Sequence, residues 1–225
     1  MKYGIIFILF AILLFYSAFL INNIFSVLII WLSIDFLISA LGYLYLGSKI
    51  YGKNENGRIK FINKIVFLPF FIILNSIWYL ANLISKEDKY NYITDNLVIG
   101  RRLLQSEIPQ EFLNEVTNYI DLTSEFTDPK SIIKEKNYIL LPILDGDIPD
   151  REKLKIALNK IKEGKTYIHC AQGHGRTGLF TIIYLVKKLG FKDYNEVSNL
   201  LNIKRPKLKL NKKQVDFVKD YLEQL

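Results

Sequence analysis

Apolar residues fill most of the first third of the chain in three long stretches, which cover residues 4–21, 24–46 and 65–84. The first two stretches are each long enough for a helix to span a bilayer core, which takes about 20 predominantly apolar residues. Only two asparagines separate them, so they are expected to form an antiparallel pair. A cleaved signal peptide is the alternative for the first stretch, but its apolar run is long and no small-residue cleavage motif follows it. We therefore interpret residues 1–84 as a membrane region.

The third apolar stretch decides the predicted topology. Residues 65–84 contain Pro69, Asn75 and Asn82, so they either cross the bilayer as a third span or lie in its interface. Residues 47–64 carry five basic side chains against one acidic one, and the positive-inside rule places them in the cytoplasm. A third span would put the rest of the chain on the other side of the membrane. We expect an integral membrane protein with a cytoplasmic C-terminal domain, which requires that the third stretch does not cross.

After the third stretch, short apolar runs alternate with helical patterns of apolar positions. Strands are expected at residues 97–100, 117–122, 138–141 and 166–170. Helices are expected at residues 109–116, 129–136, 150–161, 179–186, 193–201 and 211–222. This alternation predicts an α/β fold, with a mostly parallel central sheet flanked by helices on both faces. In such sheets, ligands bind beyond the carboxyl ends of the strands.

Charge and cysteine content separate the two regions further. Residues 1–84 carry six Lys/Arg and two Asp/Glu, whereas residues 85–225 carry 24 and 20. The second region therefore has the composition of a soluble domain, and its length of 141 residues suffices for a core of its own. A single cysteine excludes an intramolecular disulfide, and the cysteine and two histidines lie within six residues of one another. We therefore expect no structural zinc site, no other metal and no cofactor.

The candidate chemistry lies between an expected strand and an expected helix, in residues 169–178, with the sequence HCAQGHGRTG. We call these residues the phosphate loop. The amides of a glycine-bearing loop at a helix N-terminus converge on a bound anion, and the helix dipole favours negative charge there. The same groups, together with Arg176, are expected to hold Cys170 as a thiolate. The loop therefore combines a nucleophile with a phosphate clamp.

The phosphate loop resembles the signature loop of the cysteine-dependent dual-specificity phosphatases, a branch of the protein tyrosine phosphatase superfamily. The resemblance covers roughly residues 90–220. It implies that Cys170 attacks phosphorus to give a phosphocysteine, that Arg176 clamps two phosphate oxygens, and that Thr177 stabilises the leaving thiolate. His169 is implied to order the loop and tune the thiol. The implied phosphate-binding residues are Ala171, Gln172, Gly173, His174, Gly175 and Arg176.

The family also requires an aspartate, on a loop upstream, that protonates the leaving group. Residues 141–149 follow an expected strand, precede an expected helix and contain two aspartates. An aspartate separated by three residues from a following proline, as Asp145 is from Pro149, is similar to the acid loop of several family members, which favours Asp145. Asp147 is the alternative general acid. Asp150 is expected to cap the following helix instead.

A basic run occupies residues 204–213, with six positive charges and no negative one. A solvated face is the simplest interpretation; the functional one is attraction of anionic lipid head groups or a polyanionic substrate. Arg205 and Pro206 resemble an Arg-Pro step that lies near the active site in the family, and Gln214 is a candidate for its water-positioning glutamine. The run lacks interleaved aromatic residues, so no nucleic-acid partner is expected.

The sequence thus predicts a membrane-anchored phosphatase that acts on a phosphorylated protein or a lipid phosphate. The loop interior contains no lysine, and family members that act on multiply phosphorylated inositol lipids commonly carry lysines there. Highly charged phosphoinositides are therefore disfavoured. The alternative is a catalytically idle phosphate-binding module on a membrane scaffold. The oligomeric state is not predicted.

Overall fold

The computed structural model describes every residue except 1, 22 and 225. Its internal contacts divide the chain into two compact units, of which the first comprises Met1–Asn54 and Ile59–Lys86 and the second comprises Glu55–Arg58 and Glu87–Leu225. The main boundary therefore lies two residues beyond the end of the expected membrane region. Asn22, which belongs to the expected turn between the first two apolar stretches, lies outside the described residues.

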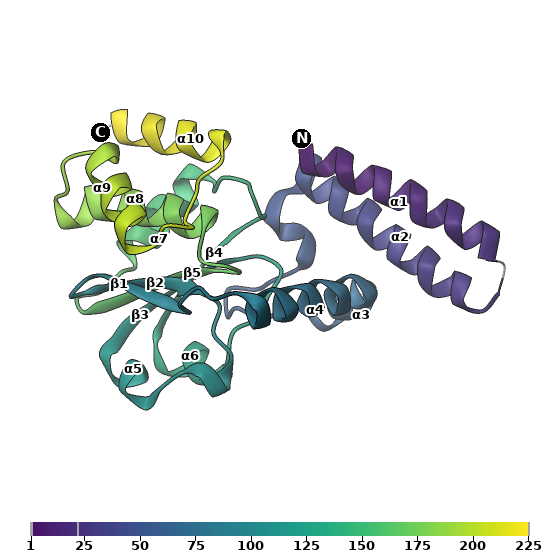
Figure 1. The fold of residues 1–225 in the computed structure, drawn as a ribbon, viewed down its shortest axis with the longest axis horizontal. Helices are drawn as coiled ribbons and strands as arrows, with labels where there is room; N and C mark the ends of the chain where they lie inside the picture. Colours follow the sequence, from purple (N-terminus) through teal and green to yellow (C-terminus); the bar gives the residue numbers. More distant parts are fainter. Residues whose placement is uncertain (1, 22, 225) are drawn as a thin grey trace. The chain divides into compact units, whose positions relative to one another are not determined.

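The first unit begins with two apolar helices, α1 (Lys2–Ile21) and α2 (Phe25–Leu41), which lie side by side (Figure 1). A π-helical turn (Gly42–Leu46) and a 3-10 turn (Gly47–Tyr51) extend α2. The helical segments Lys2–Ile21 and Phe25–Tyr51 are long and apolar enough to cross a membrane. The helices contact each other through a hydrogen bond from the Ser33 hydroxyl to the Ala11 carbonyl over 2.8 Å and through aromatic pairs such as Phe7 with Phe36.

The third apolar stretch forms two helices, α3 (Phe61–Val66) and α4 (Leu68–Ile84), instead of one continuous segment over residues 65–84. Residues 47–64, which we expect from their turn residues to form a polar loop, are not all loop, since they include the 3-10 turn and the first turn of α3. Pro69 explains the break, because a proline lacks the N–H of the helical ladder and its ring clashes with the carbonyl four residues earlier. The buried Asp35 carboxylate accepts the Phe70 N–H over 3.2 Å and so satisfies a free donor in the first turn of α4.

The second unit is built around a five-stranded sheet. Its strands are β1 (Tyr90–Thr94), β2 (Leu97–Arg101), β3 (Val116–Thr123), β4 (Asn137–Ile143) and β5 (Lys165–Cys170). The strand order is β1-β2-β5-β3-β4, and only the edge pair β1–β2 is antiparallel. The predicted α/β fold with a mostly parallel sheet is confirmed. The edge strand β1 was not predicted, although the short turn at residues 95–96 after an aromatic, β-branched run is a hairpin signal.

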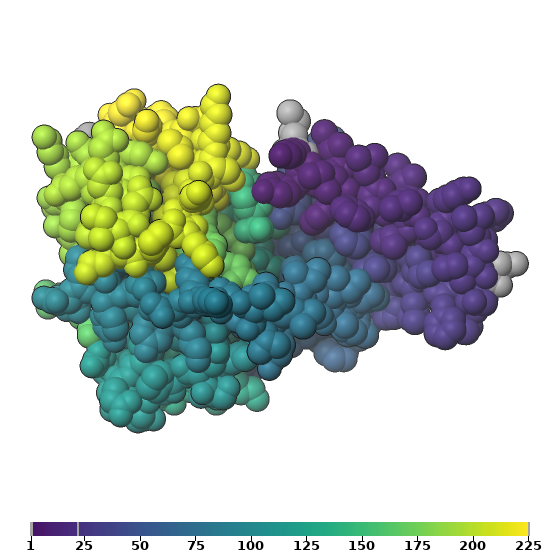
Figure 2. Space-filling view, in the orientation of Figure 1, coloured from purple at the N-terminus to yellow at the C-terminus, as the bar shows by residue number. Residues whose placement is uncertain are grey.

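Helices cover both faces of this sheet (Figure 1). One face carries α5 (Gln110–Glu115) and α6 (Lys130–Glu135). The other carries α7 (Arg151–Asn159), α8 (Gly175–Leu189), α9 (Tyr194–Lys204) and α10 (Lys212–Glu223). In the space-filling view, α9 and α10 form a continuous surface over this second face (Figure 2).

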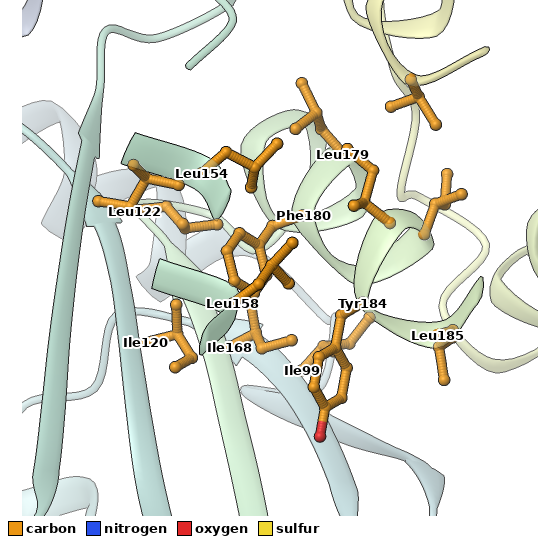
Figure 3. Packing of buried hydrophobic residues seen from close by; sticks show 14 of the residues in the cluster. Ile99, Ile120, Leu122, Leu154, Leu158, Ile168, Leu179, Phe180, Tyr184 and Leu185 are labelled. Carbon is orange, nitrogen blue, oxygen red and sulfur yellow. The ribbon is translucent and has the colours of Figure 1, made fainter. Parts of the chain in front are cut away.

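Strand alternation sends successive side chains of β5 into different cores. Tyr167 packs with the α5 and α6 side of the sheet, whereas Ile168 packs with the α7 to α10 side. Figure 3 shows Ile168 and its neighbours on adjacent strands facing Leu179 and Phe180 of α8. Because β5 is the central strand and α8 is buried along most of its length, the loop that joins them is held at both ends.

Candidate active site

The phosphate loop, residues 169–178, begins with the last two residues of β5 and ends in the first turn of α8, which starts at Gly175. Gly173 has a φ of +72°, and a Cβ there would lie 2.4 Å from the Gly100 carbonyl group, so only glycine fits this position. The Arg102 N–H donates to the Cys170 carbonyl over 2.8 Å. These contacts pin the loop against the end of β2, and Cys170 itself is only 3% exposed.

Arg176 lies in the first turn of α8 and is buried, with a carboxylate facing its guanidinium. Its Nη1 and Nη2 donate to the two carboxylate oxygens of Glu125 over 3.0 and 2.8 Å, and Nη1 also donates to the Ile143 carbonyl over 3.0 Å. Burial alone would raise the pKa of Glu125, but the charge and hydrogen bonds of Arg176 and the Ser124 hydroxyl lower it below its usual value. The Arg176 Nε is buried and has no partner among the described residues, so this donor is available to an anion.

The structure separates the two candidate general acids. Asp145 Oδ1 lies 3.2 Å from Arg176 Nη2, and the Asp145 side chain is 73% exposed. Asp147 instead forms an ion pair with Lys213 and accepts the Ile148 N–H over 2.9 Å. Asp145 is therefore the aspartate beside the clamp. Asp150 accepts the Lys153 N–H over 3.0 Å and caps α7, as predicted.

His169 is fully buried beneath the loop and bridges it to the neighbouring strand end. Its Nδ1 lies 3.2 Å from the Cys170 carbonyl and its Nε2 lies 3.1 Å from Asp128 Oδ2. Both oxygens only accept hydrogen bonds, so both ring nitrogens must donate. Burial alone would lower the pKa of His169, but Asp128 and Asp121 outweigh this and raise it. Through its contact with the Cys170 carbonyl, His169 orders the backbone of the nucleophile.

Asp121, Asp128 and His169 have ligand atoms within 4.8 Å of one another, close enough for one cation. The count of cysteines and histidines that excluded zinc did not include these carboxylates. In the structure His169 Nε2 lies 3.1 Å from Asp128 Oδ2, and Asp121 accepts the hydroxyls of Thr123 and Tyr138. This arrangement fits a buried hydrogen-bond network better than a metal site.

Two further residues assigned from the sequence lie at the loop. The Thr177 hydroxyl is buried and has no hydrogen-bond partner among the described residues. Gln214 accepts the Asn211 N–H over 3.1 Å and donates to the Asp147 carbonyl over 3.1 Å. A Cβ on Gly175 would lie 2.8 Å from Gln214 Oε1, so this amide packs directly on the loop.

Sequence reasoning missed the acidic partners of the site, which are Glu87, Asp121, Glu125 and Asp128. Glu125 could have been identified from the sequence as a site residue, because it closely follows the carboxyl end of β3, and ligands of parallel sheets bind at such ends. Within the basic run, Arg205 is buried, whereas its five lysines are exposed. Arg205 therefore belongs to the site's framework, and the lysines belong to the surface.

Solved structures of phosphatase type share the fold of the second unit. Tk-PTP in its active form is 22% identical, with a TM-score of 0.54 over 61% of this chain and 98% of its own. PTPMT1 in complex with PI(5)P is 16% identical, with a TM-score of 0.54 over 61% and 96%. The human tyrosine phosphatase-like serine/threonine/tyrosine-interacting protein is 20% identical, with a TM-score of 0.52 over 60% and 96%. No curated protein matches the chain.

The sequence itself carries the family assignment. The family model described as PTP-SAK, Swiss Army Knife protein, DSP-PTPase phosphatase domain, matches residues 99–219, which is more than half of the chain. This segment extends from β2 through the phosphate loop into α10. The chain therefore belongs to the PTP-SAK family of dual-specificity-type phosphatase domains.

Proposed function

We propose that the protein is a membrane-anchored phosphatase that hydrolyses phosphomonoesters through a phosphocysteine intermediate. One observation carries the proposal: the loop that begins at Cys170 ends at a buried Arg176, and Asp145 Oδ1 lies 3.2 Å from that arginine. A nucleophile, a cationic clamp and a proton donor are the three groups that the reaction requires. Membership of a phosphatase family supports the same conclusion.

In the first step, the Cys170 thiolate attacks phosphorus, the S–P bond forms and the ester P–O bond breaks. Glu125 holds one edge of the Arg176 guanidinium, which leaves Nε and the second hydrogen of Nη2 for two phosphate oxygens. Asp145 now lies on Nη2, where a phosphate oxygen would displace it. The displaced carboxyl group then donates its proton to the leaving oxygen.

In the second step, water attacks the phosphocysteine and the S–P bond breaks, which releases inorganic phosphate and returns the thiolate. Asp145 takes a proton from the attacking water and is thereby reset. The Thr177 hydroxyl is buried without a partner among the described residues, so it is free to donate to the departing sulfur. His169 supports both steps by holding the Cys170 carbonyl.

The first unit supports anchoring in a bilayer, with the catalytic unit in the cytoplasm. Two helical segments, Lys2–Ile21 and Phe25–Tyr51, have the length and hydropathy of membrane spans. The helix α4 has 17 residues and a length of about 25 Å, which is short for a hydrocarbon core of about 30 Å. An α4 that stays on one side agrees with a cytoplasmic C-terminal unit.

The substrate is a phosphorylated protein or a lipid phosphate. The solved complex of PTPMT1 with PI(5)P supports including a lipid with a single phosphate on its ring. The loop interior of this chain has no lysine, which argues against highly charged phosphoinositides. Phosphotyrosine and phosphoserine peptides and a lipid monophosphate therefore form the substrate panel.

The test is turnover of this panel by the full-length protein in detergent, compared with the variant Cys170→Ser. We expect the variant to lose turnover by at least about 10³-fold, because it lacks the nucleophile. It should keep its circular dichroism spectrum and its affinity for inorganic phosphate. Equal turnover by both proteins would refute the phosphocysteine mechanism. Phosphate binding by a wild type without turnover would favour the idle binding module.

A matched pair of variants tests the general acid. We expect Asp145→Asn to lower kcat by about 100-fold on an alkyl phosphate, because general acid catalysis contributes about 10²- to 10⁴-fold. On an aryl phosphate with a good leaving group the loss should be much smaller. Asp147→Asn changes the same charge two residues away and should lower kcat less than threefold. The reverse order would assign the proton to Asp147.

A further inference from the structure

Arg205 is buried at 1% exposure and its guanidinium is bonded to the phosphate loop. Its Nε donates to the Gly173 carbonyl over 3.0 Å, and its Nη2 donates to the Gln172 carbonyl over 3.1 Å. In a trans peptide the N–H points away from the carbonyl of the same unit. Arg205 therefore turns the N–H groups of Gly173 and His174 away from itself, and these are two of the amides assigned to phosphate binding.

The residues that follow α4 hold Arg205 in turn. Its Nη1 donates to the Asp88 carbonyl over 3.1 Å and to Asn91 Oδ1 over 2.6 Å. Its Nη2 lies 3.3 Å from Glu87 Oε1. These contacts extend the support of the loop to a segment more than 80 residues earlier in the chain.

Glu87 contacts the loop at a second point. Its Oε2 and Oε1 lie 2.9 and 3.1 Å from His174 Nε2, which donates to the carboxylate. The Glu87 side chain is 15% exposed and the Arg205 side chain 1%, so solvent screens this pair weakly. Removing one partner of a buried ion pair leaves the other charge uncompensated, which is costly.

We propose that Glu87 is a positioning residue of the phosphate loop. Its carboxylate compensates the charge of Arg205 and fixes the His174 side chain, and both contacts keep the loop amides in their anion-binding arrangement. Glu87 acts on the loop through Arg205 and His174. The affinity of the site for phosphate thereby depends on a residue that lies three positions after the end of the apolar helix α4. The kinetic part of this proposal rests on the proposed function, whereas the binding part does not.

The test compares full-length wild type with Glu87→Gln in detergent. Calorimetric titration with inorganic phosphate gives Kd, and hydrolysis of a small aryl phosphate gives KM and kcat. We expect Kd and KM to rise about tenfold and kcat to change less than threefold, because a disordered loop weakens ground state and transition state alike. Glu87→Asp keeps the charge on a shorter side chain and should recover part of the affinity. Glu111→Gln makes the same substitution at an exposed position of α5 and should have no effect.

Unchanged Kd and KM in Glu87→Gln would overturn the proposal. A fall in kcat at constant KM would also overturn it, because a smaller folded fraction has that signature. If Glu87→Gln does not fold, the proposal is decided by Glu87→Asp, which must then show a raised Kd. The wild type could also bind phosphate more tightly than Glu87→Gln and yet hydrolyse no substrate. That result would refute the proposed phosphatase activity but would support the positioning role of Glu87.

Discussion

The two units of the chain place their apolar side chains in opposite ways. In α1, the buried residues are Gly4, Ala11 and Ala18, while large side chains such as Leu13 and Phe19 are 58% and 81% exposed. In the second unit most large apolar residues are buried in two clusters, and few of those described, such as Ile203, are exposed. Small residues between helices with large apolar residues outside are typical of membrane helices, whose surroundings are as apolar as leucine.

The units also differ in how they bury charge. The first unit buries one carboxylate, Asp35, against a backbone N–H. The second unit buries charges as pairs around one loop, where Arg176 faces Glu125 and His169 faces Asp128. Buried pairs are poor devices for stability compared with apolar packing, but they fix geometry. The first unit therefore turns its large apolar side chains toward its surroundings, whereas the second unit uses buried charged pairs to hold the side chains of the phosphate loop in one arrangement.

The largest expected effect comes from breaking a buried pair of the second unit. Glu125→Gln removes the buried carboxylate that is bonded to both Nη atoms of Arg176. Arg176 is 1% exposed and keeps, among the described residues, only the exposed Asp145 as an acidic neighbour, so we expect a loss of about 3 kcal/mol in the free energy of unfolding. Chemical denaturation of the full-length protein at neutral pH, followed by circular dichroism and by the fluorescence of tyrosines in the second unit, measures the difference. Glu111→Gln is the exposed control and should change stability by less than about 0.5 kcal/mol.

The same pair gives a pH dependence with a defined sign. The pKa of Glu125 is lowered in the folded protein, so the pair stabilises the fold above the ordinary glutamate pKa. This contribution is lost as the pH falls through the lowered pKa. The difference between wild type and Glu125→Gln should therefore shrink in strong acid. A difference that stays constant with pH would show that the substitution acts through packing and not through charge.

Local sequence patterns were sufficient for one part of the site and not for the other. Cys170 and Arg176 lie on one loop, so their spacing and the flanking strand and helix identify them. Glu125 is 51 residues from Arg176, and Asp128 is 41 residues from His169. Such partners are set by the strand order, in which β5 pairs with both β2 and β3. Helix and strand periodicity does not specify that order, so the acidic partners could not be assigned.

The fold, like the site, could be predicted from the sequence only where local patterns are sufficient. The alternation of strand and helix patterns was sufficient for an α/β unit with a mostly parallel sheet, since each element is a local property. The break between α3 and α4 could have been expected from Pro69, but the apolar composition on both sides masked it. The antiparallel strand β1 is short and mostly half-exposed, so it lacks the apolar signal of the inner strands.

A comparable effect, about 3 kcal/mol, is expected when the outward-facing apolar surface of the first unit is charged. Leu13 lies near the middle of α1 and is 58% exposed. A lysine near the centre of a membrane helix costs about 2.5 to 3.5 kcal/mol in insertion. Leu13→Lys should therefore move a large share of the protein from the membrane fraction to the carbonate-extractable fraction. Ile156→Lys, at a 52% exposed position of α7, is the matched substitution in the second unit and should leave both fractions unchanged. If both variants stayed in the membrane fraction to the same extent, α1 would not be in contact with lipid, and the contrast between the two units would reduce to a difference in packing.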